Sequence, residues 1–431
     1  PYACPEGHTA IFNGFRAAPP RLIPPVDSAS AGCSLRVALE LAKAVALHRS
    51  TVRILLLTCN TSSDASSGGA LGFGRVLRLE HTSRRVMNAM VESGAGASAS
   101  LAAAAATSQS LDTNELEVAW GALGKMSVAR LRKTSATHNR AQRAPLTGTY
   151  AITGGLGGLG LRAAVLLAAM GAGGVVLGSR SGRVPRDGAA QYASLRALSL
   201  ASVRVLPSDV SDERDLQKLV DVPGPALAGI LHAAGVLRDK MIRSMVSADV
   251  DAVFTSKALA ASRLHGATAC VPLAALGLFS SISALVGNVG QANYAAANAS
   301  MDTLALGRRL GGMVGSSMQI PAVSGGGMGA ATFDAAQLEA MGAISLHTFA
   351  ANLLTSMLLG RAAAERSQVP LTSKAIHNFS KSPTFSELQH TTSSRAAAST
   401  KDPVATGSAI AQELAPLAPG ARRAYVETSV L

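Results

Sequence analysis

Aromatic residues, cysteines and charged residues are all scarce in this chain of 431 residues. Aromatic side chains make up 3% of it and charged ones 15%, whereas hydrophobic residues reach 48%. This composition is typical of a globular protein and argues against a disordered chain. The length allows two or three domains, and we expect a core built mainly from small aliphatic side chains.

The four cysteines, Cys4, Cys33, Cys59 and Cys270, form no CxxC pair and have no metal-ligand spacing. We therefore expect reduced thiols, no metal site and a cytoplasmic protein. No apolar run reaches the length of a membrane span, so no membrane partner is expected. The chain begins at Pro1 without a signal-peptide pattern, which suggests a piece of a longer protein.

The formal net charge is +13, but the basic residues are scattered and no Lys/Arg block has interleaved aromatics. A nucleic-acid partner is therefore not expected, and a steep salt dependence of binding would be needed to revive that idea. A basic surface equally suits an acidic protein partner or ligands that carry phosphate.

The most informative stretch is residues 149–180, TYAITGGLGGLGLRAAVLLAAMGAGGVVLGSR. It predicts a strand over residues 149–153, a glycine-dense turn, a helix over residues 161–170 and a second strand over residues 174–177. The turn contains two overlapping spacings, TGxxxGxG and GxGxxG, which let the backbone approach a pyrophosphate at a helix N-terminus. Because strand, turn and helix all fit, we predict a dinucleotide site. Its expected residues are Thr153, Gly154, Gly155, Leu156, Gly157, Gly158, Leu159 and Gly160.

Strands and helices alternate along most of the chain, which predicts an α/β fold with a parallel sheet covered on both faces. Upstream of the glycine turn we expect helices at 35–47 and 69–79, strands at 52–58, 85–91, 116–120 and 125–131, and a helix or insertion at 95–110. Downstream we expect helices at 185–200, from 211, at 246–265 and 291–310, and strands at 202–206, 226–233, 271–280 and 315–320. One helix is expected over 335–359. Residues 1–34 are expected to be a linker, and residues 380–407 to be disordered.

Open α/β sheets bind ligands at the carboxyl ends of their strands, so we predict further cofactor contacts there. Ser179 and Arg180 follow the second strand, where an Arg suits a 2′-phosphate and favours NADPH over NADH; a plain surface Arg is the alternative. Asp209 and Val210 follow the third strand. The fourth ends in His232, Ala233, Ala234 and Gly235, where small residues let a cofactor ribose lie close.

Ser281 ends the fifth strand, and Tyr294 lies one turn into the next helix, so both can converge on one carbonyl oxygen. A phenol is a poor acid or base at neutral pH unless a cation lowers its pKa. Four positions after Tyr294 stands Asn298 instead of a Lys, and Lys257 in the preceding helix is the candidate ammonium. Each residue alone could be a surface tyrosine or a solvated lysine; the joint placement makes coincidence improbable.

Those residues mark a resemblance. The chain resembles the ketoreductase domain of a type I polyketide synthase, a relative of the short-chain dehydrogenases, over residues 35–328. The motifs that carry the resemblance are TYAITGGLGGLG, GSRSG, GILHAAGVLRD, LFSSISALVGNVGQANYAAANASMDTLA and, upstream, GALGFGRVLRLEH.

The resemblance implies a Rossmann-like, doubly wound catalytic subdomain at residues 149–360. It would be preceded by a truncated Rossmann-like structural subdomain without cofactor at residues 35–134 and followed by a low-complexity tail at residues 361–431. It implies that NADPH delivers hydride to C3 of a 3-oxoacyl thioester, as in polyketide or fatty-acid assembly. Tyr294 would be the proton donor, Ser281 would stabilise the alkoxide and Lys257 would tune the phenol, with Asn298 as the exchanged partner. The implied partners are an acyl carrier domain bearing a phosphopantetheine arm and other synthase domains of the same polypeptide.

The family's stereochemical marker reads Leu-Asp-Asp, and this chain has Leu237-Arg238-Asp239. No Trp precedes Tyr294, so the resemblance implies a D-hydroxy product. The chain departs from the family after residue 320, where Pro321-Ala322-Val323 replaces a Trp-Gly pair beside the nicotinamide and substrate lid. A non-catalytic scaffold domain therefore stays an alternative, as does a free-standing carbonyl reductase, which the long upstream half disfavours.

Overall fold

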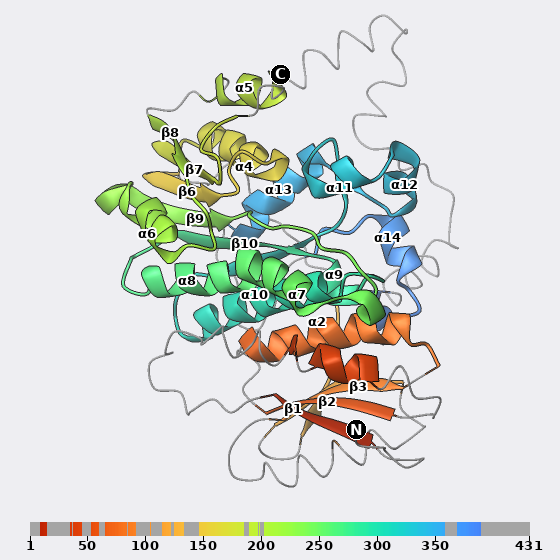
Figure 1. Cartoon of the computed structure of the whole chain (residues 1–431). Coiled ribbons are helices and arrows are strands. Elements are labelled where there is room, and N and C mark those ends of the chain that lie inside the picture. Colours follow the sequence, from red (N-terminus) through yellow and green to blue (C-terminus); the bar gives the residue numbers. More distant parts are fainter. Residues whose placement is uncertain are drawn as a thin grey trace, which may run out of the picture.

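The protein folds around two β-sheets with helices between and around them (Figure 1). This computed structural model describes residues 9–14, 35–36, 38–44, 53–59, 65–83, 85–91, 104, 114–121, 125–132, 146–184, 189–196, 198, 202–357 and 369–388. The first sheet has the order β1-β2-β3-β4-β5. Its strands are β1 (Thr9–Gly14), β2 (Arg53–Cys59), β3 (Val86–Val91), β4 (Glu117–Trp120) and β5 (Met126–Ser127). The first four pair in parallel, and β5 runs antiparallel to β4.

Two details of the first sheet differ from the sequence-based expectation. The predicted linker contains β1, because its short apolar run Ala10 to Phe12 pairs with Ile54 to Leu56 and covers an edge of β2 that would otherwise be open. The last strand is only two residues long instead of seven. The helix expected at 35–47 is present in the described residues 35–36 and 38–44, whereas 95–110, apart from residue 104, lies outside them.

The second sheet is parallel and has the order β11-β10-β9-β6-β7-β8. Its strands are β6 (Thr149–Thr153), β7 (Gly174–Ser179), β8 (Ser202–Pro207), β9 (Leu227–His232), β10 (Ala275–Ser281) and β11 (Ser316–Ile320). Read from β8, the chain order is 3-2-1-4-5-6, so the strand order reverses between β6 and β9. This is the doubly wound Rossmann arrangement that the alternation predicted.

Helices cover both faces of the second sheet because its strands are apolar on both sides. Ile152 of β6 points into a core with α4 (Gly158–Ala169) and α13 (Leu346–Met357). Its neighbour Ala151 points to the other core, against α6 (Glu213–Asp221), α8 (Ala260–Ala267) and α10 (Ala292–Leu310). This alternation is the two-residue period of a strand.

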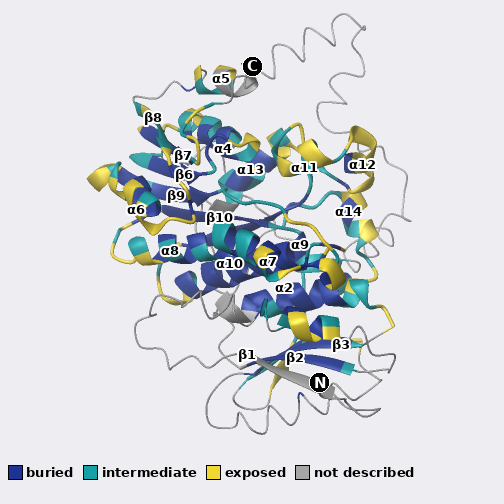
Figure 2. Cartoon of the chain, viewed as in Figure 1, coloured by how far each residue is buried: buried dark blue, intermediate teal, exposed yellow. Residues whose placement is uncertain are grey.

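Small residues let helix α2 (Ala65–Glu80) approach α10 so closely that their backbones touch (Figures 1 and 2). A Cβ on Gly72 would lie 2.3 Å from the Ala295 carbonyl oxygen, and one on Gly68 would lie 2.4 Å from that of Ala299. All residues of α10 from Ala292 to Arg308 are buried. Helix α2 thereby joins the first sheet to the helical layer of the second.

The long helix expected over 246–265 is continuous, but its middle turn is a π-helix. It consists of α7 (Ser247–Phe254), the π-turn η4 (Thr255–Leu259) and α8. The other elements before β11 are short helices at α5 (Ala189–Arg196), η2 (Gly224–Ala226), η3 (Ile242–Ser244) and α9 (Ser283–Val286).

After β11 the chain is more ordered than expected. It forms β12 (Val323–Ser324), α11 (Gly327–Thr332), α12 (Ala335–Ala340), β13 (Ile344–Ser345) and α13. The single helix expected over 335–359 is therefore wrong. The chain turns at Gly342, whose φ of +72° favours glycine, and β13 then pairs with β12.

Part of the expected tail is also folded. It contains α14 (Ser373–Asn378) and η5 (Pro383–Phe385), with Phe385 fully buried. The backbone N–H of Leu131 donates a hydrogen bond of 2.8 Å to the Thr384 carbonyl, so this segment packs beside the end of the first sheet. The remaining residues of the expected disordered stretch, from 389, lie outside the described residues. None of the helices described is long and apolar enough to cross a membrane.

The contact between α2 and α10 gives a stability prediction. Gly72→Ala should lower the free energy of unfolding by about 1–3 kcal/mol, because the added methyl group collides with rigid backbone. Gly266→Ala is the matched control, since nothing lies within 4 Å of its Cβ. At that helical position alanine should add about 0.4–1 kcal/mol. Denaturant unfolding of both variants measures the two changes, and a Gly72→Ala variant as stable as the control would contradict the close contact.

Candidate active site

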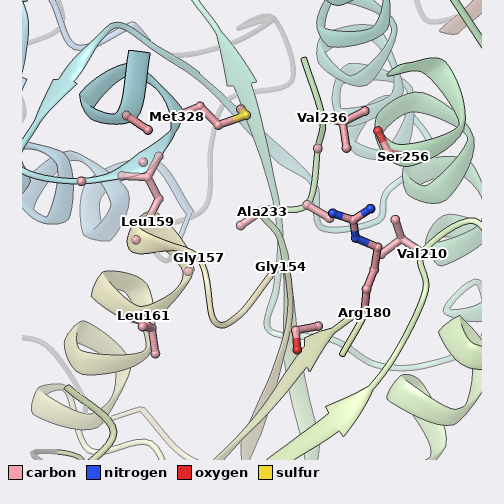
Figure 3. Close-up of a pocket in the computed structure, with 18 of the residues that line it drawn as sticks. Gly154, Gly157, Leu159, Leu161, Arg180, Val210, Ala233, Val236, Ser256 and Met328 are labelled. Carbon is pink, nitrogen blue, oxygen red and sulfur yellow. The ribbon is translucent and has the colours of Figure 1, made fainter. Parts of the chain in front are cut away.

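A cavity of about 1090 Å³ opens at the carboxyl ends of β6, β7, β8 and β9, where the strand order reverses. The glycine turn after β6 forms one side, and the segment Gly325 to Met328, which includes the start of α11, forms another (Figure 3). The predicted cofactor residues on its wall are Gly154, Gly157, Gly158, Leu159, Gly160, Ser179, Arg180, Asp209, Val210, Ala233, Ala234 and Gly235. Thr153, Gly155, Leu156 and His232 do not line this wall.

The glycine turn leaves the N-terminus of α4 open to a ligand. Gly157 is the N-cap residue, no side chain caps the helix, and no acidic residue lies in the first turn. A Cβ on Gly160 would lie 2.5 Å from the Gly154 carbonyl oxygen, so only glycine fits there. The uncapped N–H groups and the positive end of the helix dipole are suited to a pyrophosphate. The residues present therefore fit a dinucleotide.

Arg180 lies exposed just after β7 and lines the same cavity as Val210 and Ala233 (Figure 3). On the neighbouring loop, Asp209 accepts hydrogen bonds from the backbone N–H (2.9 Å) and the hydroxyl (2.7 Å) of Ser211. A cation and a hydrogen-bonded loop thus lie at the carboxyl ends of β7 and β8, on the wall of the cavity.

A buried hydrogen-bond chain connects β6, β9 and the π-turn. His232 Nε2 lies 3.1 Å from the Lys257 carbonyl oxygen and must donate to it. Its Nδ1 is then an acceptor for the Thr153 hydroxyl at 2.7 Å, and the Thr153 oxygen accepts from the Ala234 N–H. The segment at Ala234, which lines the cavity, is thus held by hydrogen bonds to β6 and β9.

Lys257 is the centre of the π-turn and is only 3% exposed. Its Nζ donates to the Phe279 carbonyl oxygen at 3.0 Å and lies 5.2 Å from the centroid of the Tyr294 ring. Gly235 on the cavity wall touches it, since a Cβ there would lie 2.7 Å from Lys257 Cε. π-Turns are frequent at functional sites.

The structure brings the four candidate catalytic residues together at the Gly235 end of the cavity, although none of them is on the cavity wall. Ser281 ends β10, while Tyr294 and Asn298 lie one turn apart on the buried helix α10. The Asn298 Nδ2 donates to the Tyr294 carbonyl oxygen at 2.8 Å. Ser281 accepts from the Ser283 N–H at 3.2 Å.

Burial dominates the electrostatics of this cluster. It raises the pKa of Tyr294 to about 12, although hydrogen bonds from Asn298 and Ser281 act in the opposite direction. It lowers the pKa of Lys257 to about 7. Lys257 is not among the influences on the pKa of Tyr294, so its expected tuning of the phenol stays a prediction. Lys257 Nζ lies over the face of the Tyr294 ring and donates to the Phe279 carbonyl oxygen, and burial makes its own charge costly.

Asp302, which the sequence reading missed, supports the lysine from one turn beyond Asn298. It is 2% exposed and accepts hydrogen bonds from the Ser317 hydroxyl and from Gln319 Nε2 (2.6 Å). Its charge is the interaction that opposes the desolvation of Lys257 and raises that pKa. The signal in the sequence was the spacing: Tyr294, Asn298 and Asp302 recur every four residues and so share one helix face.

Asp239, the candidate stereochemical residue, lies beside this cluster. It accepts a hydrogen bond of 2.8 Å from Gln291 Nε2, and burial raises its pKa. Its charge is one of the influences that raise the pKa of Tyr294. Its neighbour Arg238 lines the cavity, as do Arg162 and the segment Gly325 to Met328, none of which we had assigned to the site. The described residues contain no cluster suited to a metal ion.

Comparison with known proteins places these features in one family. A sequence model described as the KR domain matches residues 148–325. Mycoketide-CoA synthase of Mycobacterium tuberculosis is 37% identical over 252 residues, which are 56% of this chain and 6% of that protein. The spectinabilin polyketide synthase system protein NorB of Streptomyces orinoci is 33% identical over 294 residues, 66% of this chain and 13% of that protein. The chain thus spans only a small part of these curated relatives.

Solved structures agree with this assignment. An A-type ketoreductase from a modular polyketide synthase has a TM-score of 0.70 and 28% identity, covering 83% of this chain and 78% of that one. The first ketoreductase of the tylosin PKS has a TM-score of 0.62 and 30% identity, covering 74% and 71%.

Sheet order, glycine turn and uncapped helix define a Rossmann-like α/β protein. Together with the comparisons they specify it further: the chain belongs to the ketoreductase domain family of polyketide synthases.

Buried histidines predict how stability depends on pH. Burial lowers the pKa of His232 to about 3 and that of His265, whose Nδ1 accepts from Arg308 at 2.7 Å, to about 4. The unfolded chain takes up these protons near pH 6.5, so the stabilisation is complete above that pH and falls as the pH drops towards 4. Each histidine should contribute about 1.4 kcal/mol per pH unit.

Denaturant unfolding between pH 6 and 5 measures this slope. His265→Gln keeps an acceptor for Arg308 but cannot titrate, so it should remove about half of the histidine contribution. An unchanged slope in this variant would show that His265 is already charged in the folded protein.

Proposed function

We propose that this domain reduces the 3-oxo group of an acyl thioester, carried by an acyl carrier domain, to the 3-hydroxy group with NADPH as reductant. The observation that carries the proposal is the convergence of Tyr294, Ser281, Asn298 and Lys257 at one end of a dinucleotide-shaped cavity. Other domains of the same synthase polypeptide would supply the substrate and remove the product, in polyketide or fatty-acid assembly.

The chain's own residues can perform the proton chemistry. NADPH, when bound, supplies the hydride. The Tyr294 hydroxyl is protonated at neutral pH because its pKa is about 12, so it is available to donate a proton to the substrate oxygen. The Ser281 hydroxyl can donate a second hydrogen bond to that oxygen. Lys257, with a pKa near 7, can take up and release protons at neutral pH and so return a proton towards the tyrosine.

The domain division follows from the same proposal. Residues 35–134 would form the structural subdomain, extended by β1, and residues 149–360 the catalytic one. The segment after Ile320 supports an active enzyme over a scaffold, because its residues Gly325 to Met328 line the cavity even without the Trp-Gly pair.

The D-hydroxy product is a further part of the proposal. Asp239 is held by Gln291 beside Tyr294, and Trp120, the only tryptophan, lies far away on β4 of the first sheet.

Tyr294→Phe tests the reaction. With a 3-oxoacyl thioester, NADPH oxidation by the wild type should be measurable, and the variant should lose at least about a hundredfold in turnover, the scale of a lost general acid. Tyr150→Phe, which changes another buried tyrosine in the same way, should keep its turnover. A folded wild type that binds NADPH without any turnover would instead favour the scaffold function.

Arg180→Gln tests the choice of cofactor. If the guanidinium binds the 2′-phosphate, the variant should bind NADPH about 10–100-fold more weakly, the scale of a hydrogen bond between charged groups. Its affinity for NADH should not change. Arg183→Gln is the matched control, because Arg183 is exposed nearby but does not line the cavity. Fluorescence titration measures both affinities, and an equal loss for the two cofactors would rule out the 2′-phosphate contact.

A further inference from the structure

We propose that Glu80, the last residue of α2, is a positioning residue that clamps two loops beside the candidate active site. The first loop connects β9 to α7 (residues 233–246), and the second connects α9 to α10 (residues 287–291). One carboxylate oxygen accepts a hydrogen bond of 2.7 Å from the Ile242 N–H, and the other accepts one of 3.0 Å from the Gly290 N–H. Ile242 is fully buried, and Gly290 is buried at a φ of +81°. A residue of the first-sheet layer thus reaches across 162 and 210 positions of the chain to hold both loops.

The two loops also bind each other. The Lys240 N–H donates to the Gly290 carbonyl oxygen at 2.8 Å. Gln291 donates to Asp239, and Asn293 Nδ2 donates to the Arg238 carbonyl oxygen at 2.9 Å. Because Arg238 lines the cavity, the carboxylate anchors a network that ends on the cavity wall and beside Tyr294.

The position of Glu80 is not explained by the stability of its own helix. An acidic residue at a helix C-terminus faces the negative end of the dipole, which is unfavourable. The two amide hydrogen bonds offset this, and they go to the loops and not to α2. Gly287 on the second loop is equally close to α2: a Cβ there would lie 3.1 Å from the Arg75 carbonyl oxygen. The C-terminal end of α2 therefore contacts both loops.

The proposal explains how a layer without a cofactor site can influence the reaction. The loops carry Asp239 and precede Tyr294, whereas the cofactor wall is built from the turn after β6 and the ends of β7 to β9. Loosening the clamp should therefore change how substrate is held beside Asp239 and Tyr294 more than how the cofactor binds at the glycine turn. The predicted effect on substrate binding rests on the proposed ketoreduction, whereas the clamp rests only on the hydrogen bonds of Glu80.

Glu80→Gln tests the clamp, because it keeps the size of the side chain but leaves an NH₂ group facing one of the two N–H donors. Hydrogen exchange should speed up by about tenfold or more at whichever of the Ile242 and Gly290 amides faces the NH₂ group, the scale of a lost hydrogen bond to a charged group. Glu80→Asp keeps both acceptors and should restore part of the protection. Glu115→Gln is the matched control: it breaks an ion pair with Arg130 in the same layer, away from the loops.

In turnover assays Glu80→Gln should raise the KM for the 3-oxoacyl thioester several-fold and lower the ratio of D-hydroxy to L-hydroxy product, with a smaller change in NADPH affinity. A purely structural residue would lower the amount of folded enzyme and change neither KM nor product ratio. Unchanged exchange at both amides would overturn the clamp. Faster exchange with unchanged KM and product ratio would overturn its role in substrate positioning. Wild-type protein without turnover but with Glu80-dependent protection would overturn the proposed function and leave the clamp supported.

Discussion

The close packing of α2 against α10 is the contact on which the rest of the molecule depends. Glycines on one helix and alanines on the other bring the backbones together, so α10 is buried along nearly its whole length. A helix buried on all sides has little freedom to shift, and close-packed interiors transmit displacement. Tyr294, Asn298 and Asp302 project from this helix, so their relative positions are set by a contact between layers that itself carries no ligand.

Burial then determines the chemistry that these side chains can perform. In a solvated site Lys257 would stay charged at all physiological pH values, and the phenol would keep a pKa near 10. Desolvation lowers the pKa of the lysine to about 7 and raises that of the tyrosine to about 12. The negative charge of Asp302 opposes this lowering of the Lys257 pKa. The tyrosine therefore keeps its proton at neutral pH, and the lysine exchanges a proton near neutrality.

The sequence predicted the features whose causes lie close together in the chain. The glycine turn, the strand that precedes it and the helix that follows are set by local backbone requirements, and the structure has them where expected. The π-turn at Lys257 was not predicted, because its residues have ordinary helical propensity and the carbonyl bonded by His232 is 25 positions from that histidine. The break at Gly342 was read as helix because one glycine inside an apolar pattern is a weak signal, and its cause is the pairing of β12 with β13.

The contacts of Glu80 are also distant in the chain, so its motif, GRVLRLEH, does not indicate them. A carboxylate at the end of an amphipathic helix is most simply read as solvated. Its partners are backbone amides in two other loops, and backbone amides leave no mark in a sequence pattern. The layer that holds Glu80 can contribute to a site in this way, through hydrogen bonds that fix loop geometry. The first sheet and α2 can therefore influence the proposed reaction through a single carboxylate, which holds both loops at the end of α2.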